Sequence, residues 1–156
     1  MSSLATPDAL AGALRGTLTG PGDSDYDERR KLYNAMIDKR PALIARCTDA
    51  ADVIAAVGHA RSEGLPLAIR GGGHNGAGLG SVDDGLMIDL SGMRGVLVDP
   101  ASRVARVLGG SLLGDVDHAT NAFGLALPSG IYNVCRDGEP VSNELFTAAA
   151  GWHPQE

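Results

Sequence analysis

The sequence has few aromatic residues, only two cysteines and little clustered positive charge. Aromatic side chains make up 4% of the 156 residues, and the formal net charge is −6 at pH 7. Because lysine and arginine are adjacent only in the short runs at residues 29–31 and 39–40, the sequence offers no extended basic surface suited to nucleic acid or to an anionic membrane. We therefore expect neither nucleic acid nor a membrane as a partner.

The two cysteines, Cys47 and Cys135, lie far apart in the sequence. Their spacing fits neither a metal site nor a redox pair, and the four histidines show no ligand spacing, so no metal site is predicted. The first residues lack the basic and apolar regions of a secretory signal, and no stretch approaches the roughly 20 apolar residues that span a bilayer. We expect reduced, unpaired thiols and a cytoplasmic location.

Glycine, by contrast, is abundant, with 22 residues. The densest stretch is RGGGHNGAGLG, from Arg70 to Gly80, which follows the apolar run LPLAIR. Gly71, Gly73 and Gly76 match the G-x-G-x-x-G fingerprint of Rossmann-type dinucleotide binding, but that fingerprint opens a helix. Because each glycine in a helix interior costs about 0.8–1 kcal/mol, we predict a loop instead.

Two interpretations of this loop stay open from the residues alone. Residues without a Cβ atom allow successive amides to converge on an anion, so the loop suits a phosphate group. The alternative is a plain surface loop between two strands. His74, within the loop, is likewise either a solvated side chain or a functional one.

The N-terminal residues predict a short helix. Thr6, Pro7 and Asp8 combine a capping hydroxyl, a proline suited to the first helical position and an acid in the first turn. Gly16 is expected to end this helix. The segment that follows is polar and rich in turn residues.

Two longer helices are predicted further along the chain. The first covers residues 49–63, with Thr48 as its cap and Gly64 as its stop. Its apolar face is expected at Val53, Ile54, Val57 and Ala60. The second opens at Ser111 and closes at Gly124. Its apolar side is expected at Leu112, Val116, Ala119, Thr120 and Phe123.

Short apolar runs predict the strands. These runs are RPALIARC, LPLAIR, GLMIDL, GVLVD, RVARVLGG and the strand end in LALPSG. Helices alternate with strands only in part, because several strands follow one another directly. An α+β domain with mixed sheets therefore fits the order better than a regular doubly wound sheet.

Four segments occur together in a specific order and spacing. They are PGDSDYDERRKLYNAMIDKRPALIARC, RGGGHNGAGLG, GLMIDLSGM and LALPSGI. In these segments, from Pro21 to Ile131, the chain resembles the FAD-linked oxidases of the berberine bridge enzyme type, within the vanillyl-alcohol oxidase fold group. The resemblance implies an α+β, PCMH-type FAD-binding domain, of which the first subdomain and part of the second are present, with mixed sheets and flanking helices.

The resemblance also implies a division of the chain. Residues 1–35 form an N-terminal helical lead, residues 36–131 a partial PCMH-type FAD-binding domain, and residues 132–156 a divergent tail. The tail does not resemble the family's continuation, although VSNELFTAAAGW is compatible with a short helix after Ser142. A second flavin attachment through Cys135 is not favoured, because the residue that follows the PSGI match is Tyr132.

In this family the histidine of the R-G-G-G-H motif holds FAD covalently, through a ring nitrogen bonded to the 8α carbon of the flavin. The resemblance assigns that role to His74. The bond requires an imidazole that is neutral at the moment of attack. The implied cofactor-binding residues are Gly71, Gly72, Gly73, His74, Asn75, Gly78, Ser129 and Gly130.

The function implied is that of the FAD-binding portion of a flavin-dependent oxidoreductase. Such an enzyme oxidises an alcohol, sugar or alkaloid-type small molecule by hydride transfer to the flavin. No residue is assigned as the catalytic base, and the chain alone is expected to be inactive. The alternative is a truncated, inactive flavin-binding remnant or a small binding module. Self-association through exposed edges is a further expectation.

Overall fold

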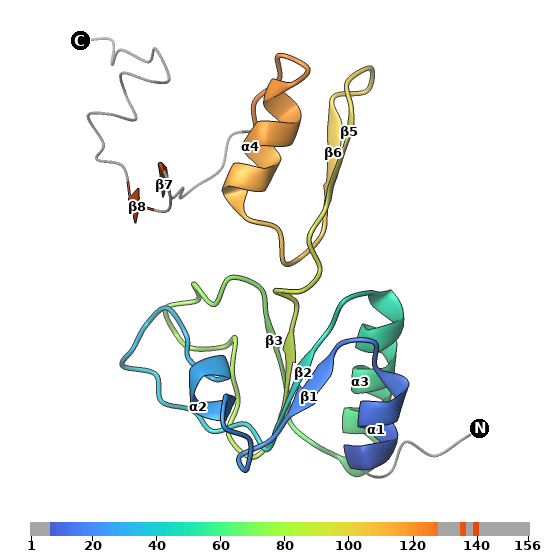
Figure 1. Cartoon of the computed structure of the whole chain (residues 1–156), viewed down its shortest axis with the longest axis vertical. Coiled ribbons are helices and arrows are strands. Elements are labelled where there is room, and N and C mark those ends of the chain that lie inside the picture. Colours follow the sequence, from blue (N-terminus) through green and yellow to red (C-terminus); the bar gives the residue numbers. More distant parts are fainter. Residues whose placement is uncertain (1–6, 128–134, 137–138, 141–156) are drawn as a thin grey trace. The chain divides into compact units, whose positions relative to one another are not determined.

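The structure, a computed structural model, describes residues 7–127, 135–136 and 139–140. The chain divides into two compact units (Figure 1). The first unit contains the residues up to Gly95 together with Leu108–Ser111, and the second contains Val96–Val107 and the residues from Leu112 onward. Within the described ranges, no helix combines the length and the apolar character needed to cross a membrane.

The first unit is built around a four-stranded mixed sheet with the strand order β1-β2-β4-β3. The strands are β1 (Thr17–Thr19), β2 (Leu43–Arg46), β3 (Leu67–Arg70) and β4 (Leu86–Asp89). Strand β1 is antiparallel to β2, whereas β2, β4 and β3 run parallel. Three of these strands lie in the apolar runs RPALIARC, LPLAIR and GLMIDL, which confirms the prediction made for each run.

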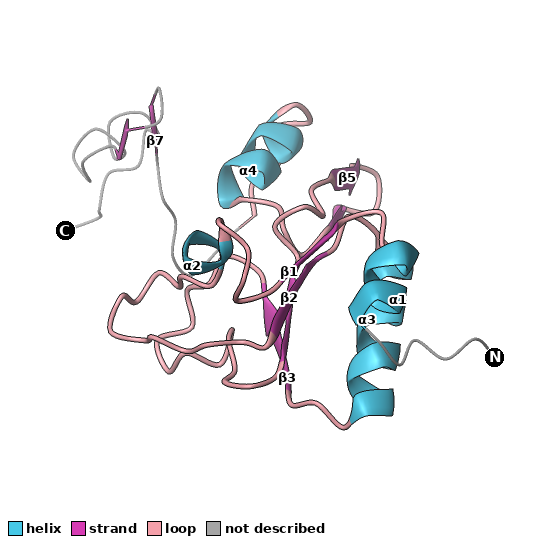
Figure 2. Ribbon diagram, turned by 60° about the horizontal axis from the view of Figure 1, so that its bottom comes forward, coloured by secondary structure: helices cyan, strands magenta, loops and turns pink. Residues whose placement is uncertain are grey.

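Helices α1 (Pro7–Ala13) and α3 (Ala50–Glu63) lie on one face of this sheet, and α2 (Tyr26–Arg29) lies with the long loops on the other (Figure 2). All four residues of β4 are buried, as expected for a central strand covered on both faces. One apolar cluster joins α1, α3 and the sheet, with the buried members Leu10, Ala45, Cys47, Ala56, Ala60, Leu86 and Ile88. A smaller cluster contains Tyr26, Ile44 and Met87.

Helix α3 corrects two details of the sequence prediction. Its N-cap is Asp49 rather than Thr48, because the Asp49 carboxylate accepts the Asp52 N–H at 3.0 Å. Its buried residues are Asp52, Ala56, His59 and Ala60, whereas Ile54, expected on the apolar face, is 72% exposed. The predicted stop at Gly64 is confirmed, with a left-handed φ of 64°.

The second unit contains the hairpin of β5 (Val96–Asp99) and β6 (Val104–Val107), the helix α4 (Leu113–Asn121) and the short pair β7 (Cys135–Arg136) and β8 (Glu139–Pro140). The N-cap of α4 is Leu112, whose N–H is accepted by the Asp115 carboxylate at 2.8 Å. Ser111, predicted to open this helix, instead exchanges hydrogen bonds with the backbone of Gly95.

The predicted apolar side of α4 is only partly correct, because its buried residues are Val116 and Thr120, whereas Leu112 and Phe123 are each 53% exposed. Residues 125–127, in the segment LALPSG, are not in a strand. Ser129, Gly130, the cap Thr6 and the helix proposed after Ser142 lie outside the described residues. The α+β class with mixed sheets is confirmed.

Candidate functional site

A pocket of about 250 Å³ opens at the carboxyl end of β3. It is lined by the last residues of the strand and by the loop that follows: Ile69, Arg70, Gly71, Gly72, Gly73, His74, Asn75, Leu79 and Gly80. The structure thus brings together five of the predicted site residues, from Gly71 to Asn75. The volume lies below the roughly 300–1,000 Å³ typical of pockets for whole ligands, so it suits one part of a large ligand.

The loop contains no helix, as predicted, and its first amides have no internal partner. Among the residues that the structure describes, no N–H from Gly71 to Asn75 donates a hydrogen bond. None of the five residues is buried, and successive N–H groups of this kind around a pocket can converge on an external acceptor. The charge best suited to them is negative.

A side chain would be strained or crowded at three glycines of this stretch. Gly73 has a φ of 72°, a region that residues with a side chain seldom occupy. A Cβ atom at Gly71 would lie 3.0 Å from the carbonyl oxygen of Gly109, and one at Gly72 would lie 2.8 Å from Cδ2 of His74. Side chains at these positions would shift either the backbone or the imidazole ring.

The side chain of His74 is exposed and makes one ring contact. Its ring centroid lies 4.7 Å from that of Tyr33, with an angle of 37° between the planes. Neither nitrogen of the ring has a hydrogen-bond partner among the described residues. The imidazole is therefore available for reaction with a group in the pocket.

Asn75 separates this open stretch from a folded second part of the loop. Its side-chain oxygen accepts the N–H groups of Ala77 and Leu79, each at 3.1 Å, and its carbonyl accepts the N–H of Gly78 at 3.0 Å. Gly78, predicted to allow close approach of a ligand, does not line the pocket. It is buried with a φ of 73°, and a Cβ there would lie 2.7 Å from the side chain of Ile37.

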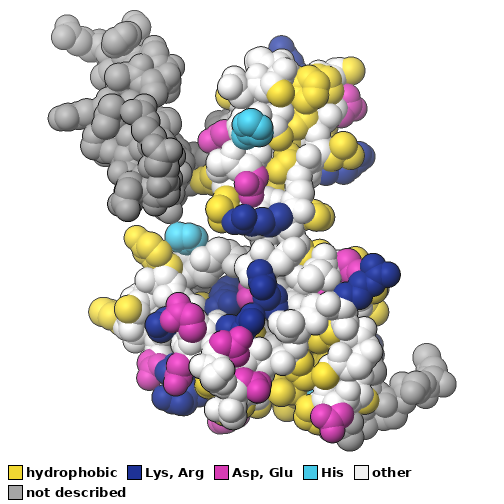
Figure 3. Space-filling view, viewed as in Figure 1, with side chains coloured by type: hydrophobic (Ala, Val, Ile, Leu, Met, Phe, Trp, Pro, Cys, Tyr) yellow, Lys and Arg dark blue, Asp and Glu magenta, His cyan; other side chains and the backbone are white. Residues whose placement is uncertain are grey.

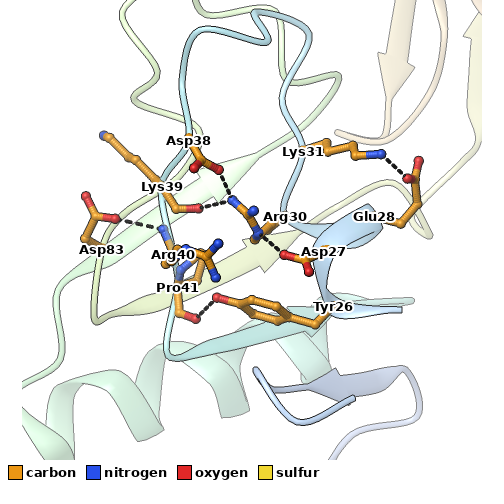
Figure 4. A network of polar contacts seen from close by, with 10 residues as sticks. All are labelled: Tyr26, Asp27, Glu28, Arg30, Lys31, Asp38, Lys39, Arg40, Pro41 and Asp83. Carbon is orange, nitrogen blue, oxygen red and sulfur yellow. Dashed lines mark hydrogen bonds and ion pairs between the residues drawn. The ribbon is translucent and has the colours of Figure 1, made fainter. Parts of the chain in front are cut away.

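Residues 32–40 run beside the whole loop and are bonded to it, and we call this segment the brace. The N–H of Tyr33 donates to the Gly73 carbonyl at 3.3 Å, and the Asn34 amide donates to the Gly76 carbonyl at 3.3 Å. The Lys39 ammonium donates to the carbonyls of Gly78 and Ser81, each at 3.0 Å. A further contact, from the Arg40 N–H to Asp83, is drawn in Figure 4.

The brace is itself held by Arg30, whose guanidinium binds the carboxylates of Asp27 and Asp38 and the carbonyl of Lys39 (Figure 4). The hydrogen bond from Arg30 keeps the pKa of Asp38 below its usual range. Nearby, the buried hydroxyl of Tyr26 donates to the Pro41 carbonyl at 2.6 Å, and burial raises the pKa of that phenol. Acidic and basic side chains lie next to one another on the face of the first unit that Figure 3 shows.

Sequence reasoning missed the ion pair between Arg70 and Asp89. The Arg70 guanidinium donates to Asp89 at 2.8 Å and to the carbonyls of Arg29 and Lys31. Burial by itself raises the pKa of Asp89, but the hydrogen bonds from Arg70 and from the Ser91 N–H outweigh it, so that the pKa lies below its usual range. The signal was present, since aligned parallel strands place the residues that end LPLAIR and GLMID side by side.

Arg70 is the only charged residue among those that line the pocket, and its charge is already engaged. An anion in the pocket would therefore depend on the backbone amides from Gly71 to Asn75 rather than on a free cation. This arrangement is typical of loops that bind phosphate groups through peptide dipoles. The imidazole of His74 lies in the wall of the same pocket.

The sequence model of the family described as "FAD binding domain" matches residues 41–136. Because this range exceeds half of the chain, the chain belongs to the FAD-binding domain family, which occurs in flavin-dependent oxidoreductases. The chain is 37% identical over 131 residues to the (R)-6-hydroxynicotine oxidase of Paenarthrobacter nicotinovorans, covering 84% of this chain and 28% of the relative. It is 34% identical over 141 residues to an FAD-linked oxidoreductase of Bacillus subtilis, covering 88% and 31%.

Solved structures show the same likeness. The crystal structure of 6-hydroxy-D-nicotine oxidase from Arthrobacter nicotinovorans matches with a TM-score of 0.70 and 37% identity, over 78% of this chain and 26% of that one. The berberine-bridge-enzyme-like protein 1 of Physcomitrella patens matches with a TM-score of 0.68 and 29% identity, over 75% and 26%. The resemblance found in the sequence is confirmed, and the chain spans less than a third of the length of the curated relatives it matches.

Proposed function

We propose that this chain binds the diphosphate of FAD through the amides from Gly71 to Asn75 and bonds the flavin covalently through His74. The observation that supports this most strongly is the run of five unpaired N–H groups around the pocket. Gly73 has a left-handed φ, which disfavours a side chain at that position. The imidazole of His74, whose nitrogens make no hydrogen bond within the described residues, lies in the same wall of the pocket. Gly78 acts indirectly, through its packing on Ile37. Ser129 and Gly130 remain proposed contacts.

The covalent step forms one bond and removes two hydrogens. A ring nitrogen of His74 joins the 8α carbon in place of one methyl C–H bond, and the imidazole gives up its N–H proton. A bound flavin would supply the two-electron oxidation that this bond requires, with dioxygen as the final acceptor of the electron pair and the two protons as hydrogen peroxide. The residues of this chain contribute a fixed imidazole and a backbone that holds the anionic end of the cofactor.

At the level of the whole protein, we propose oxidation of a small organic molecule by hydride transfer to this flavin. The relatives include oxidases named for 6-hydroxynicotine and for aclacinomycin, and the substrate class that we propose is an alcohol, a sugar or an alkaloid-type molecule. A cytoplasmic location belongs to this proposal. The competing proposal is a binding module that retains the diphosphate loop without turnover, since the described residues contain no group that we can assign as the catalytic base.

Acid precipitation tests the covalent bond. The purified chain is incubated with FAD, precipitated with trichloroacetic acid and washed, and flavin absorbance is measured in the pellet. We expect the pellet of the wild-type chain to be yellow and that of His74→Ala to be colourless. The exposed His118 gives a matched control, because His118→Ala should retain the colour. Flavin found only in the wild-type supernatant would contradict covalent attachment.

A further measurement addresses the choice between the oxidoreductase proposal and the binding module. Peroxide release is followed with a panel of sugars, alcohols and cyclic amines, using the flavin-loaded chain. Flavin retention without turnover is the result expected of this chain alone, and it agrees with the binding module. Turnover that disappears in His74→Ala supports the oxidoreductase proposal.

A further inference from the structure

The ring of Tyr33 contacts the ring of His74, and the proposed attachment has so far used only His74. The two centroids are 4.7 Å apart with the planes tilted by 37°, a distance within the range of favourable aromatic pairs. Tyr33 is 76% exposed, so its ring does not belong to the hydrophobic core. Its contact with the imidazole therefore needs an explanation other than core packing.

Hydrogen bonds to the loop hold the backbone from which the Tyr33 ring projects. The N–H of Tyr33 donates to the carbonyl of Gly73, the residue directly before His74. The next residue of the brace, Asn34, donates to the carbonyl of Gly76 on the other side of His74. Two hydrogen bonds thus set the brace against the loop around the histidine, and the tyrosine ring is positioned from the same loop that it contacts.

The backbone of Gly72 lies close to the imidazole ring of His74 as well. A Cβ at this position would lie 2.8 Å from Cδ2 of His74, so the ring lies directly against the bare backbone of Gly72. An exposed histidine normally samples several rotamers. In this structure the imidazole lies beside the Tyr33 ring and the backbone of Gly72, in the wall of the pocket.

We propose that Tyr33 is a positioning residue for His74, whose ring holds the imidazole in the orientation needed for bonding to the flavin. The inference rests on the proposed function. It assigns the role to the aromatic ring and not to the phenol, because the Tyr33 hydroxyl makes no hydrogen bond within the described residues. Phenylalanine should therefore substitute for tyrosine, whereas an aliphatic side chain should not.

The test compares Tyr33→Leu, Tyr33→Phe and a control, Met36→Ala, in the same 156-residue chain. Met36 lies in the brace and is 87% exposed, so its truncation tests for a general disturbance of the segment. The initial rate of acid-stable flavin attachment is measured with excess FAD. Because small misplacements of a reacting group cost up to about 100-fold in rate, we expect Tyr33→Leu to be slower by about tenfold or more. The other two variants should stay within about twofold.

Two further readouts separate positioning from other roles. Nuclear magnetic resonance of the FAD-free chain should show His74 ring protons shifted by the neighbouring ring in wild type and Tyr33→Phe, and a smaller shift in Tyr33→Leu. Noncovalent FAD affinity is then measured in the His74→Ala background, where Tyr33→Leu should change nothing. A loss of affinity in that background would mean that Tyr33 contacts the cofactor itself, and would overturn the inference.

The failures of the inference and of the proposed function are distinguishable. Equal attachment rates in wild type and Tyr33→Leu overturn the inference while the proposed attachment stands. A wild-type chain that gains no acid-stable flavin overturns the proposed attachment, and the positioning role falls with it. Slow attachment in Tyr33→Leu with rapid attachment in Tyr33→Phe and unchanged affinity in the His74→Ala background supports both.

Discussion

The connection between β3 and β4 has two halves that are constructed differently. In the open half, from Gly71 to Asn75, no N–H donates a hydrogen bond within the described part of the chain. In the braced half, residues 76–85, five N–H groups donate hydrogen bonds within the loop or to the brace, and the carbonyls of Gly76, Gly78 and Ser81 accept hydrogen bonds from the brace. Both halves are rich in glycine, so composition does not distinguish them. The difference shows that the unbonded N–H groups of residues 71–75 lie next to residues that are held by hydrogen bonds.

Arg70 connects the start of the loop to Asp89 and to residues 29–31, and removing its guanidinium should lower the stability more than any other change considered below. Arg70→Ala leaves the carboxylate of Asp89 buried without its cationic partner and releases residues 29–31. Loss of one member of a buried pair costs about 3–5 kcal/mol, so we expect a fall of that order in the free energy of unfolding. Urea denaturation measures it.

Arg61→Ala is the matched control for that experiment, because Arg61 is exposed in the last turn of α3. Its free energy of unfolding should change by less than about 0.5 kcal/mol. If both arginine variants are equally stable, Arg70 does not support the loop, and the distinction between the two halves has another cause.

A low pH should weaken the ion pair between Arg70 and Asp89. Burial raises the pKa of Asp89, and the bonds from Arg70 and Ser91 lower it more, so that the folded-state pKa lies below the unfolded one. The stability from this group is therefore full above about pH 4 and is lost as the pH falls through the folded-state pKa. We expect the free energy of unfolding to fall more steeply between pH 5 and pH 2 in the wild type than in Asp89→Asn, by about 1–3 kcal/mol. Parallel curves for the two proteins would contradict this.

Glycine substitutions sharpen the comparison between the halves. Gly73→Ala puts a side chain at a φ of 72°, which costs about 1–2 kcal/mol or shifts the open amides. Gly76→Ala is the control, because a Cβ there meets nothing within 4 Å. We expect at least about tenfold weaker FAD binding for Gly73→Ala and little change for Gly76→Ala. Equal affinities, measured by flavin fluorescence, would indicate that the open backbone does not bind the cofactor.

Lys39→Met should have the smallest effect and should be confined to the braced half. The ammonium donates to the carbonyls of Gly78 and Ser81, and its loss should cost about 1 kcal/mol. Hydrogen exchange should become faster at amides of residues 76–81 and stay unchanged in α3. Lys31→Met, which removes only an exposed pair with Glu28, provides the control. Faster exchange throughout the first unit would show that Lys39 has a global role instead.

The sequence was sufficient to predict what depends on neighbouring residues. The strands in LPLAIR and GLMIDL, the stop at Gly64 and the helix-free glycine loop follow from local preferences and from the cost of glycine in a helix. The family resemblance added the fold and His74. The residues that hold the loop were not predicted, because Arg70 meets Asp89 only through the register of two parallel strands. Tyr33 likewise meets His74 only after the brace lies beside the loop.

The predicted apolar face of α3 was wrong at Ile54 for a similar reason. The pattern of apolar residues placed Ile54 toward the core, but the sheet covers the side that contains Ala56 and Ala60. Small side chains allow the helix to approach the strands closely, and the polar residues Asp52 and His59 are buried with them. A periodicity count gives such residues little weight, so the true buried side was not evident from sequence alone.

The most direct test of the account is a titration of the chain with FAD, followed by amide chemical shifts in a nuclear magnetic resonance spectrum. The open amides are proposed to bind the diphosphate, whereas the N–H groups of Ala77, Gly78, Leu79, Ser81 and Asp84 in the braced half already donate hydrogen bonds. The largest shifts should therefore occur at the N–H groups from Gly71 to Asn75, with small shifts at those five bonded amides. Shifts that spare Gly71–Asn75, or that are largest in the braced half, would contradict the central claim that the open half of this loop binds the cofactor.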